Sequence, residues 1–342
     1  MHIRMNDLRA VIRHALMTEG GLKVPVGRRS DLTPVLVRTA AHAYTTFISG
    51  WNAWLREQGA APVEPIRLSG SSTHAEQDEL EGRDAVYGDI DYLVSFPIIA
   101  DDGDRRRSEA ASAKRYASLM VQYLREEHPK NVDVELTLAG ADPLSVIMLL
   151  PDGALVQVDT VVTHPSYAEW MKGRYTPERG IKGYVTGNLY KALGDFLVMT
   201  IGTEGVTARL RGTERVPARF RTGITYKSIT TNFRNFLVDI ATYLLGHDYR
   251  ADPLLRAHPG LDPDRVTVDD LAQGILGLAN TLDAAGAYDR DVMLRQILSS
   301  FEDGLAESVD KKAGRDLSPD KEQRLRELNA TQVDRVRRAF GL

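Results

Sequence analysis

The chain has 342 residues, long enough for two packed lobes, and its 43% hydrophobic and 26% charged residues are typical of a globular protein. Its net charge of −4 argues against a protein that coats nucleic acid through bulk charge, although a local basic groove is compatible with it. The absence of cysteine excludes thiolate catalysis, disulfide bonds and zinc–thiolate sites.

The first half of the chain predicts a mixed lobe of helices and strands. A short strand from Pro65 leads into a small-residue turn, 69–72, and a polar stretch, 73–88, separates that turn from a second strand over 89–96. The turn Pro151-Asp152-Gly153 predicts that the strands on its two sides form an antiparallel hairpin. Helices are predicted over 5–19, 33–58 and 105–127, and further strands over 132–138, 144–150 and 155–162.

The second half of the chain predicts helices over most of its length. These helices are expected over residues 184–200, 228–245, 266–285, 289–309 and 318–340. Arginines 209, 211, 215, 219 and 221 fall in a Gly/Pro-bearing loop, either a solvated loop or a basic lip for a nucleic-acid or nucleotide acceptor. The predicted fold class is therefore α+β, with a mixed sheet lobe and flanking helices in residues 1–180 and a helical lobe in residues 181–342.

Two aspartates open an apolar strand. Asp89 and Asp91 flank Ile90, so both carboxylates emerge on one face while Ile90 points into the core. Carboxylates crowded in this way repel one another unless a cation neutralises them, and hard oxygen ligands on a strand suit Mg2+ or Mn2+. Other acidic pairs share this spacing; Asp133 and Glu135, which also lie on a good strand, are the second choice.

A third aspartate interrupts a strongly β-forming run. Asp159 shares one face of the strand over 155–162 with Gln157 and Val161. If this strand lies beside the one that carries Asp89 and Asp91, three carboxylates converge on one site. The site would then hold a divalent metal ion.

The order of these motifs resembles that of the polymerase-beta-type nucleotidyltransferase superfamily. The family motif runs Gly-Ser, a spacer, Asp-x-Asp and a later lone Asp, which here correspond to Gly70-Ser71, Asp89 with Asp91, and Asp159. The hairpin around Asp152 is similar to that of the branch containing cyclic-oligonucleotide and oligoadenylate synthases. The resemblance covers about residues 34–245.

This resemblance implies phosphoryl transfer from an NTP such as ATP, with two Mg2+ or Mn2+ ions held by Asp89, Asp91 and Asp159. Pyrophosphate would leave, and the acceptor would be an RNA or DNA 3′ end, another nucleotide or another hydroxyl. The resemblance also nominates contacts to the triphosphate: the turn residues Gly70, Ser71 and Ser72, the helix lysine Lys191, and Lys227 with Ser228 at the opening of the next helix.

The sequence departs from the family pattern at one place, and it is also compatible with two other functions. Between Ser71 and Asp89 lie 17 residues, more than is usual in the family, so either 73–88 is an insertion or Gly82 or Gly88 shapes the phosphate loop. One alternative is a non-catalytic member that binds nucleotide or a partner. The other is a metal-dependent glycosyltransferase with an Asp-x-Asp pair, which leaves Asp159 unexplained.

The expected location is the cytoplasm, without a membrane partner. No apolar run approaches the roughly 20 residues that cross a bilayer. Residues 1–7 lack the apolar core of a signal peptide. The missing cysteines agree with this expectation.

Overall fold

The computed structural model divides into two compact units, Met1–Ala168 and Glu169–Leu342. It describes residues 32–82, 87, 90–97, 105–127, 132–135, 144–163, 167–174, 183–202, 205–217, 222–246, 260–313 and 319–342. The predicted helix over 5–19 and the predicted lobe boundary between 180 and 181 lie outside these residues. Helices and strands occur in both units, which confirms the α+β class.

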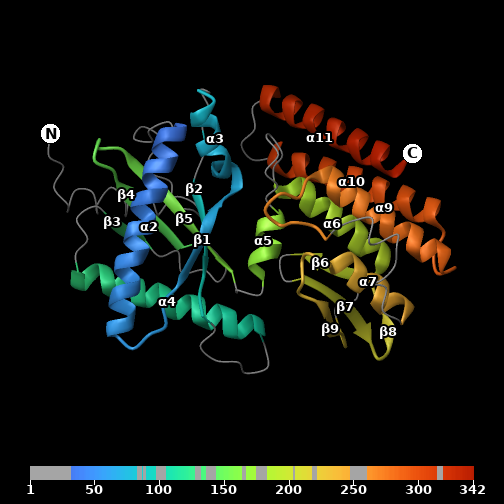
Figure 1. Cartoon of the computed structure of the whole chain (residues 1–342), viewed down its shortest axis with the longest axis horizontal. Helices are drawn as coiled ribbons and strands as arrows, with labels where there is room; N and C mark the ends of the chain where they lie inside the picture. The colour runs from blue at the N-terminus through green and yellow to red at the C-terminus, as the bar shows by residue number, and fades with distance from the viewer. Residues whose placement is uncertain are drawn as a thin grey trace. The chain divides into compact units, whose positions relative to one another are not determined.

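The first unit holds a five-stranded mixed sheet with the strand order β1-β2-β5-β4-β3 (Figure 1). β2 and β5 run parallel, and the other neighbouring pairs run antiparallel. The elements are α2 (Pro34–Glu57), β1 (Glu64–Ser69), the 3-10 helix η2 (Gly70–His74), α3 (Ala75–Leu80), β2 (Ile90–Ser95), α4 (Arg105–Glu127), β3 (Val132–Glu135), β4 (Leu144–Leu149) and β5 (Leu155–Thr163). The predicted strands are thus confirmed, and α3 lies within the polar stretch 73–88.

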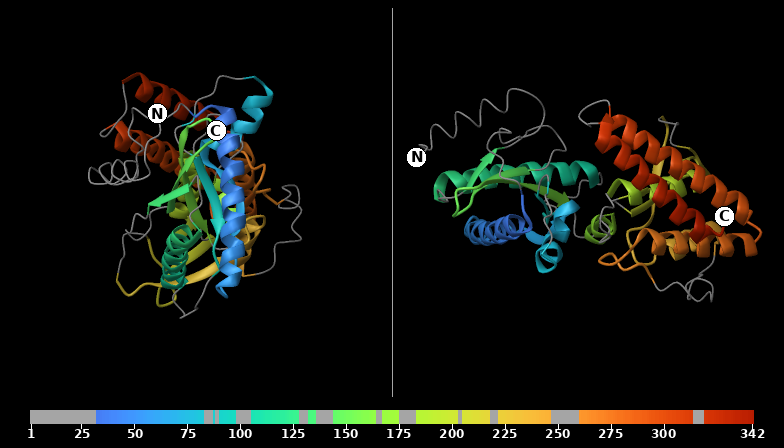
Figure 2. Two further views of the ribbon diagram at one scale, coloured as in Figure 1. Left: turned by 90° about the vertical axis from the view of Figure 1, so that its left-hand side faces the viewer. Right: turned by 90° about the horizontal axis from the view of Figure 1, so that it is seen from above.

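α2 begins at a capped end and packs along one side of the sheet (Figure 2). The Thr33 side chain accepts a hydrogen bond from the N–H of Leu36 at 3.3 Å, and Pro34 occupies the first turn, where its missing N–H is not needed. Trp51, fully buried on α2, meets Tyr116 of α4 edge to face with ring centroids 6.2 Å apart. These aromatic contacts join the two helices into one core with the sheet.

The β4–β5 hairpin has the predicted turn. Gly153 has φ = 85°, a left-handed conformation that favours glycine. The Asp152 side chain accepts a hydrogen bond from the N–H of Ala154 at 3.0 Å, and the Leu150 N–H donates to the Ala154 carbonyl at 2.8 Å. This turn fixes the register of β5, and therefore the face on which Asp159 lies, because a slip of one residue would move it to the other face.

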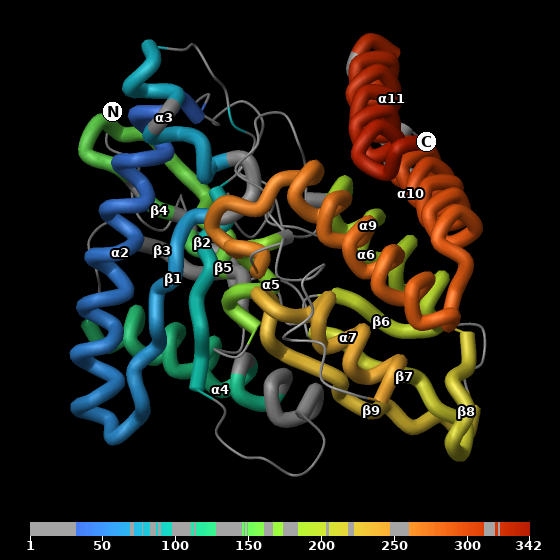
Figure 3. The backbone as a smooth tube through the Cα atoms, turned by 45° about the vertical axis from the view of Figure 1, so that its right-hand side comes forward, coloured from blue at the N-terminus to red at the C-terminus, as the bar shows by residue number. Residues whose placement is uncertain are grey.

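The second unit combines helices with a four-stranded antiparallel sheet in which β7 pairs with each of the other strands. α7 lies beside β7 and β9 (Figure 3). Its elements are α5 (Ala168–Arg174), α6 (Gly183–Leu197), β6 (Met199–Gly202), β7 (Gly205–Arg211), β8 (Glu214–Arg215), β9 (Thr225–Thr230), α7 (Phe236–Leu245), α9 (Val268–Ala284), α10 (Arg290–Ala313) and α11 (Pro319–Phe340). The three predicted C-terminal helices are confirmed as α9, α10 and α11.

The sheet corrects two predictions for the mainly helical second lobe, the arginine-bearing loop and the start of the helix over 228–245. Arg209, Arg211 and Arg215 lie on strands rather than in a loop, and Lys227 and its neighbours lie on β9 rather than at the start of a helix. The segment 205–211 alternates between the two faces of the sheet, and 225–230 is rich in β-branched and aromatic residues. Both features favour strands. The signal was therefore present in the sequence and was missed.

An aromatic cluster forms a second, separate core in this unit. Trp170 packs edge to face on Phe233 with ring centroids 5.1 Å apart, and its Nε1 donates to the Thr231 carbonyl at 2.8 Å. Gly173 lies so close to this ring that an added Cβ would meet Phe233 at 2.2 Å. Each unit therefore has its own core of buried aromatic residues.

Candidate active site

Two aspartates lie side by side on the five-stranded sheet. β2 and β5 pair in parallel with Asp91 opposite Asp159. Neighbouring strands are about 4.8 Å apart, and residues in register present their side chains to the same face. Both aspartate side chains are partly exposed. The strand adjacency on which the predicted convergence depended is therefore present for these two carboxylates.

α2 covers the opposite face of these two strands. The Tyr44 hydroxyl on α2 lies 2.5 Å from Oγ1 of Thr160, and the Tyr92 hydroxyl lies 3.2 Å from Oγ1 of Thr45. Burial raises the pKa of the Tyr44 hydroxyl well above its usual range, and the nearby Tyr92 and Asp159 add to this increase. The buried contact holds β5 next to Asp159 and leaves the aspartates on the face away from α2.

Gln157 holds one of the carboxylates in place. Its Nε2 donates a 2.7 Å hydrogen bond to Oδ1 of Asp159. Its Oε1 is buried without a hydrogen-bond partner among the described residues. A hydrogen bond to a carboxylate is stronger than one between neutral groups, so it orients Asp159 on the sheet face. The alternating pattern predicted that Gln157 shares the face of Asp159, but nothing in the sequence indicated a role for it.

The Gly-Ser turn begins next to Asp91. Ser69, the last residue of β1, pairs with Asp91, and the chain then enters η2, which Gly70 and Ser71 open. The Ser72 side chain is only 1% exposed, so its hydroxyl packs inside the unit. The Ser72 hydroxyl is therefore not on the open surface of this turn.

The donor set of this site fits a divalent cation in part. Asp89, the third predicted ligand, lies outside the described residues. Within the parts of the chain that the structure describes, no group of three or more His, Cys, Asp or Glu side chains is placed to hold a metal ion. Asp91 and Asp159 nevertheless supply oxygen donors of the kind that Mg2+ and Mn2+ accept. The second-choice strand β3, with Asp133 and Glu135, lies two strands from β5 in the same sheet.

The predicted triphosphate contacts further along the chain belong to the second unit. Lys191 is exposed on α6. Lys227, on β9, places its Nζ 5.4 Å from the ring centroid of Tyr243 on α7. Ser228 is exposed on β9 and pairs with Thr207 of β7. Their placement on a strand, and not at a helix start, removes the reason for which Lys227 and Ser228 were nominated.

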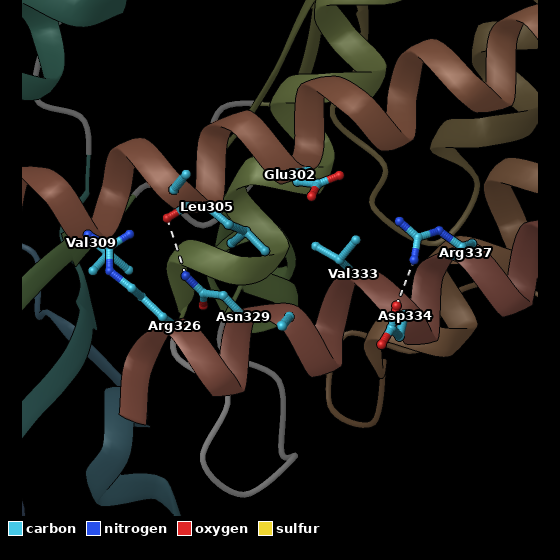
Figure 4. A pocket seen from close by; sticks show the side chains of 10 residues that line it. Glu302, Leu305, Val309, Arg326, Asn329, Val333, Asp334 and Arg337 are labelled. Carbon is cyan, nitrogen blue, oxygen red and sulfur yellow. Dashed lines mark hydrogen bonds and ion pairs between the residues drawn. The ribbon is translucent and has the colours of Figure 1, made fainter. Parts of the chain in front are cut away.

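A groove also lies between α10 and α11 (Figure 4). Its volume of about 250 Å3 is below the range usual for ligand pockets. The Asn329 side chain donates from Nδ2 to the Leu305 carbonyl at 3.2 Å and accepts from the Tyr184 hydroxyl at 2.7 Å. These two bonds join the Asn329 side chain to α10 and α6, as expected where helices pack together.

Comparison with known proteins gives no relative for this chain: no family model matches it, and no curated protein matches its sequence. None of the described helices is both long and apolar enough to cross a membrane. The function must therefore be argued from the geometry of the site.

Proposed function

We propose that this chain is a metal-dependent nucleotidyltransferase that transfers NMP from an NTP to a hydroxyl acceptor and releases pyrophosphate. The observation that carries the proposal is the pairing of Asp91 with Asp159 on parallel neighbouring strands. Like charges directly opposite one another on a sheet repel, and a divalent cation between them removes that cost. The pair is thus better explained by a bound metal ion than by stability of the sheet.

The position of the Gly-Ser turn supports the same reaction. Ser69 pairs with Asp91, so the turn that follows it starts at the acidic pair. Gly82 lies beyond α3, at the far side of the spacer. This arrangement favours Gly70 and Ser71 over Gly82 as the phosphate loop. If Gly70 and Ser71 form that loop, the long spacer is an insertion that contains α3; Gly88, the other candidate, lies outside the described residues.

In the proposed reaction, the acceptor oxygen forms a bond to the α-phosphorus as the bond from that phosphorus to pyrophosphate breaks. Divalent ions, when bound, would neutralise phosphate charge and lower the pKa of the acceptor hydroxyl. Asp89 and Asp91 would hold the ions, one of which accompanies the triphosphate. Asp159 would help to hold an ion at the acceptor hydroxyl and take the proton of that hydroxyl, and the Gly70 turn would offset the charge of the leaving pyrophosphate.

Transfer from labelled nucleotides tests this proposal. Purified protein is incubated with each α-32P-labelled NTP and Mg2+ or Mn2+, with and without RNA, and products are resolved by chromatography and gel. We expect a labelled product whose rate of formation falls by at least about 10³-fold in Asp159→Asn, because a metal-holding carboxylate is lost. Glu57→Gln, which neutralises an exposed carboxylate on α2 of the same unit, is the control and should act like the wild type.

Each alternative function has its own result in this experiment. Nucleotide binding without any product would support the non-catalytic protein. Sugar transfer from labelled UDP-glucose, lost in Asp91→Asn but not in Asp159→Asn, would support the glycosyltransferase. Transfer that survives in both variants would show that the metal site is wrongly assigned.

A further inference from the structure

The four-stranded sheet of the second unit has one apolar face and one polar face. Val206 and Ala208 of β7 are fully buried. Register then places the alternating residues on the other face, which we call the outer face. The outer face is made of Thr200, Thr207, Arg209, Arg211, Glu214, Tyr226 and Ser228.

An arginine and a tyrosine lie at opposed positions in the middle of the outer face. β7 and β9 set Arg209 directly opposite Tyr226. Nε of Arg209 donates to Oγ1 of Thr200 at 2.9 Å, which holds the guanidinium group against the sheet. The Tyr226 side chain is 67% exposed, and Arg211, two residues along β7, is also exposed. An exposed aromatic ring thus lies on the same face as two arginines, opposite Arg209 and diagonal to Arg211, whose own neighbour on β8 is Glu214.

Charge is concentrated in this segment against the trend of the chain. Residues 205–230 contain six basic residues and one acidic residue, a net charge of +5, whereas the whole chain carries −4. Some of these charges have structural partners on the inner face: Arg215 donates to the Leu197 carbonyl and the Tyr288 hydroxyl, and Lys227 lies over Tyr243. Among the described residues of this segment, Arg209 and Arg211 are the cations of the outer face, and Arg219 and Arg221 lie outside the described residues.

We infer that the outer face binds single-stranded nucleic acid. The ring of Tyr226 can stack on an unpaired base, and the two arginines can contact flanking phosphates. Bases within a duplex are stacked on one another and do not reach such a ring, so a duplex would use only the arginines. This step rests on the proposed transferase function: the acceptor of the transferred nucleotide is then a nucleic-acid strand with a free 3′ end.

Binding is measured without NTP or metal, so that it does not depend on catalysis. The full-length protein is titrated into a fluorescent single-stranded RNA of about twelve nucleotides, and anisotropy is read at several salt concentrations. We expect Kd to rise about tenfold or more in Tyr226→Ala and to stay within about twofold of wild type in Tyr226→Phe, which keeps the ring.

The arginines are tested through the salt dependence of binding. In the double variant Arg209→Ala, Arg211→Ala, the slope of log Kd against log salt should fall by about 1.4, because about 0.7 is lost for each single-strand phosphate contact. The double variant Arg295→Ala, Arg324→Ala removes the same charge from exposed positions on α10 and α11 and should keep the wild-type slope.

Three results would overturn the inference. They are no binding by the wild type at low salt, equal binding by Tyr226→Ala, and equal or tighter binding of a duplex of the same sequence. Binding of the strand without any transfer of label would contradict the proposed function but support the binding surface. Transfer of label to another acceptor, with no strand binding, would support the proposed function and contradict the binding surface.

Discussion

The two sheets of this protein use cross-strand pairs of opposite character. In the five-stranded sheet, β2 and β5 set Asp91 opposite Asp159, two groups of like charge. In the four-stranded sheet, β7 and β9 set Arg209 opposite Tyr226, a cation and a neutral aromatic residue that do not repel one another. We propose that a cation binds between the strands at the first pair, and that the second pair belongs to an exposed surface that accepts a larger, anionic ligand.

The largest effect is expected where the like charges meet. Asp91→Asn should lower the transfer rate by at least about 10³-fold, yet change the free energy of unfolding in EDTA by less than about 1 kcal/mol, because it removes cross-strand repulsion. Thermal unfolding with increasing Mg2+ checks the metal site directly. The melting temperature of the wild type should rise, and that of Asp91→Asn should rise less. An equal rise in both proteins would contradict the site.

Each unit has a buried tyrosine in its core, and the hydrogen bonds of these two tyrosines differ in length. The Tyr44 hydroxyl lies 2.5 Å from Thr160, whereas the Tyr190 hydroxyl lies 3.4 Å from the Gly173 carbonyl that accepts its hydrogen bond. Tyr44→Phe leaves a buried hydroxyl without its partner and should cost about 1–3 kcal/mol at neutral pH. Tyr190→Phe should cost less, because a weak bond is lost. Equal costs in urea unfolding would contradict this difference.

The same two tyrosines should make the folded protein less stable at alkaline pH. Burial raises the pKa of Tyr44 and of Tyr190 in the folded state. The folded protein therefore keeps protons that the unfolded chain loses, so stability present below about pH 10 is lost as the pH rises above it. The loss is at most about 1.4 kcal/mol per pH unit for each tyrosine, and each Phe variant should remove one such contribution from urea-unfolding profiles. An unchanged profile in both variants would show that these hydroxyls ionise freely.

A smaller effect on activity is expected at Gln157. Gln157→Leu removes the hydrogen bond to Asp159 and also removes a buried oxygen that lacks a partner, two contributions of similar size, so stability should change little. Activity should fall about tenfold, with a higher Mg2+ concentration at half-maximal rate, because Asp159 is less well oriented. Gln157→Glu adds a further carboxylate to the site and should lower the transfer rate without the same rise in the Mg2+ concentration at half-maximal rate. A rate loss with unchanged Mg2+ dependence would argue against orientation of a metal ligand.

The smallest effect concerns the stability of the outer face. Because Tyr226 is 67% exposed, Tyr226→Ala should lower the free energy of unfolding by less than about 1 kcal/mol. Urea unfolding measures this value and shows that loss of strand binding in the variant is not loss of fold. A cost of several kcal/mol would instead make Tyr226 a structural residue of the sheet.

Local patterns predicted much of the first unit and less of the second. The capped helix α2, the turn at Gly153 and the parity that puts Gln157 and Asp159 on one face all follow from neighbours in sequence. The strands β7 and β9 also carried local signals, but arginines among glycines and prolines resemble a loop when no partner strand is known. Strand propensity is weak unless pairing is known as well.

The sequence by itself determined which carboxylates are candidates, on which strand face each lies, and where the turn falls that fixes the register of β5. Only the tertiary structure decided that β2 lies beside β5 with Asp91 opposite Asp159, and that Arg209 lies opposite Tyr226. The reason is that helical and strand periodicities are set by the backbone within a few residues. The choice of a partner strand depends instead on burial and loop closure over the whole unit.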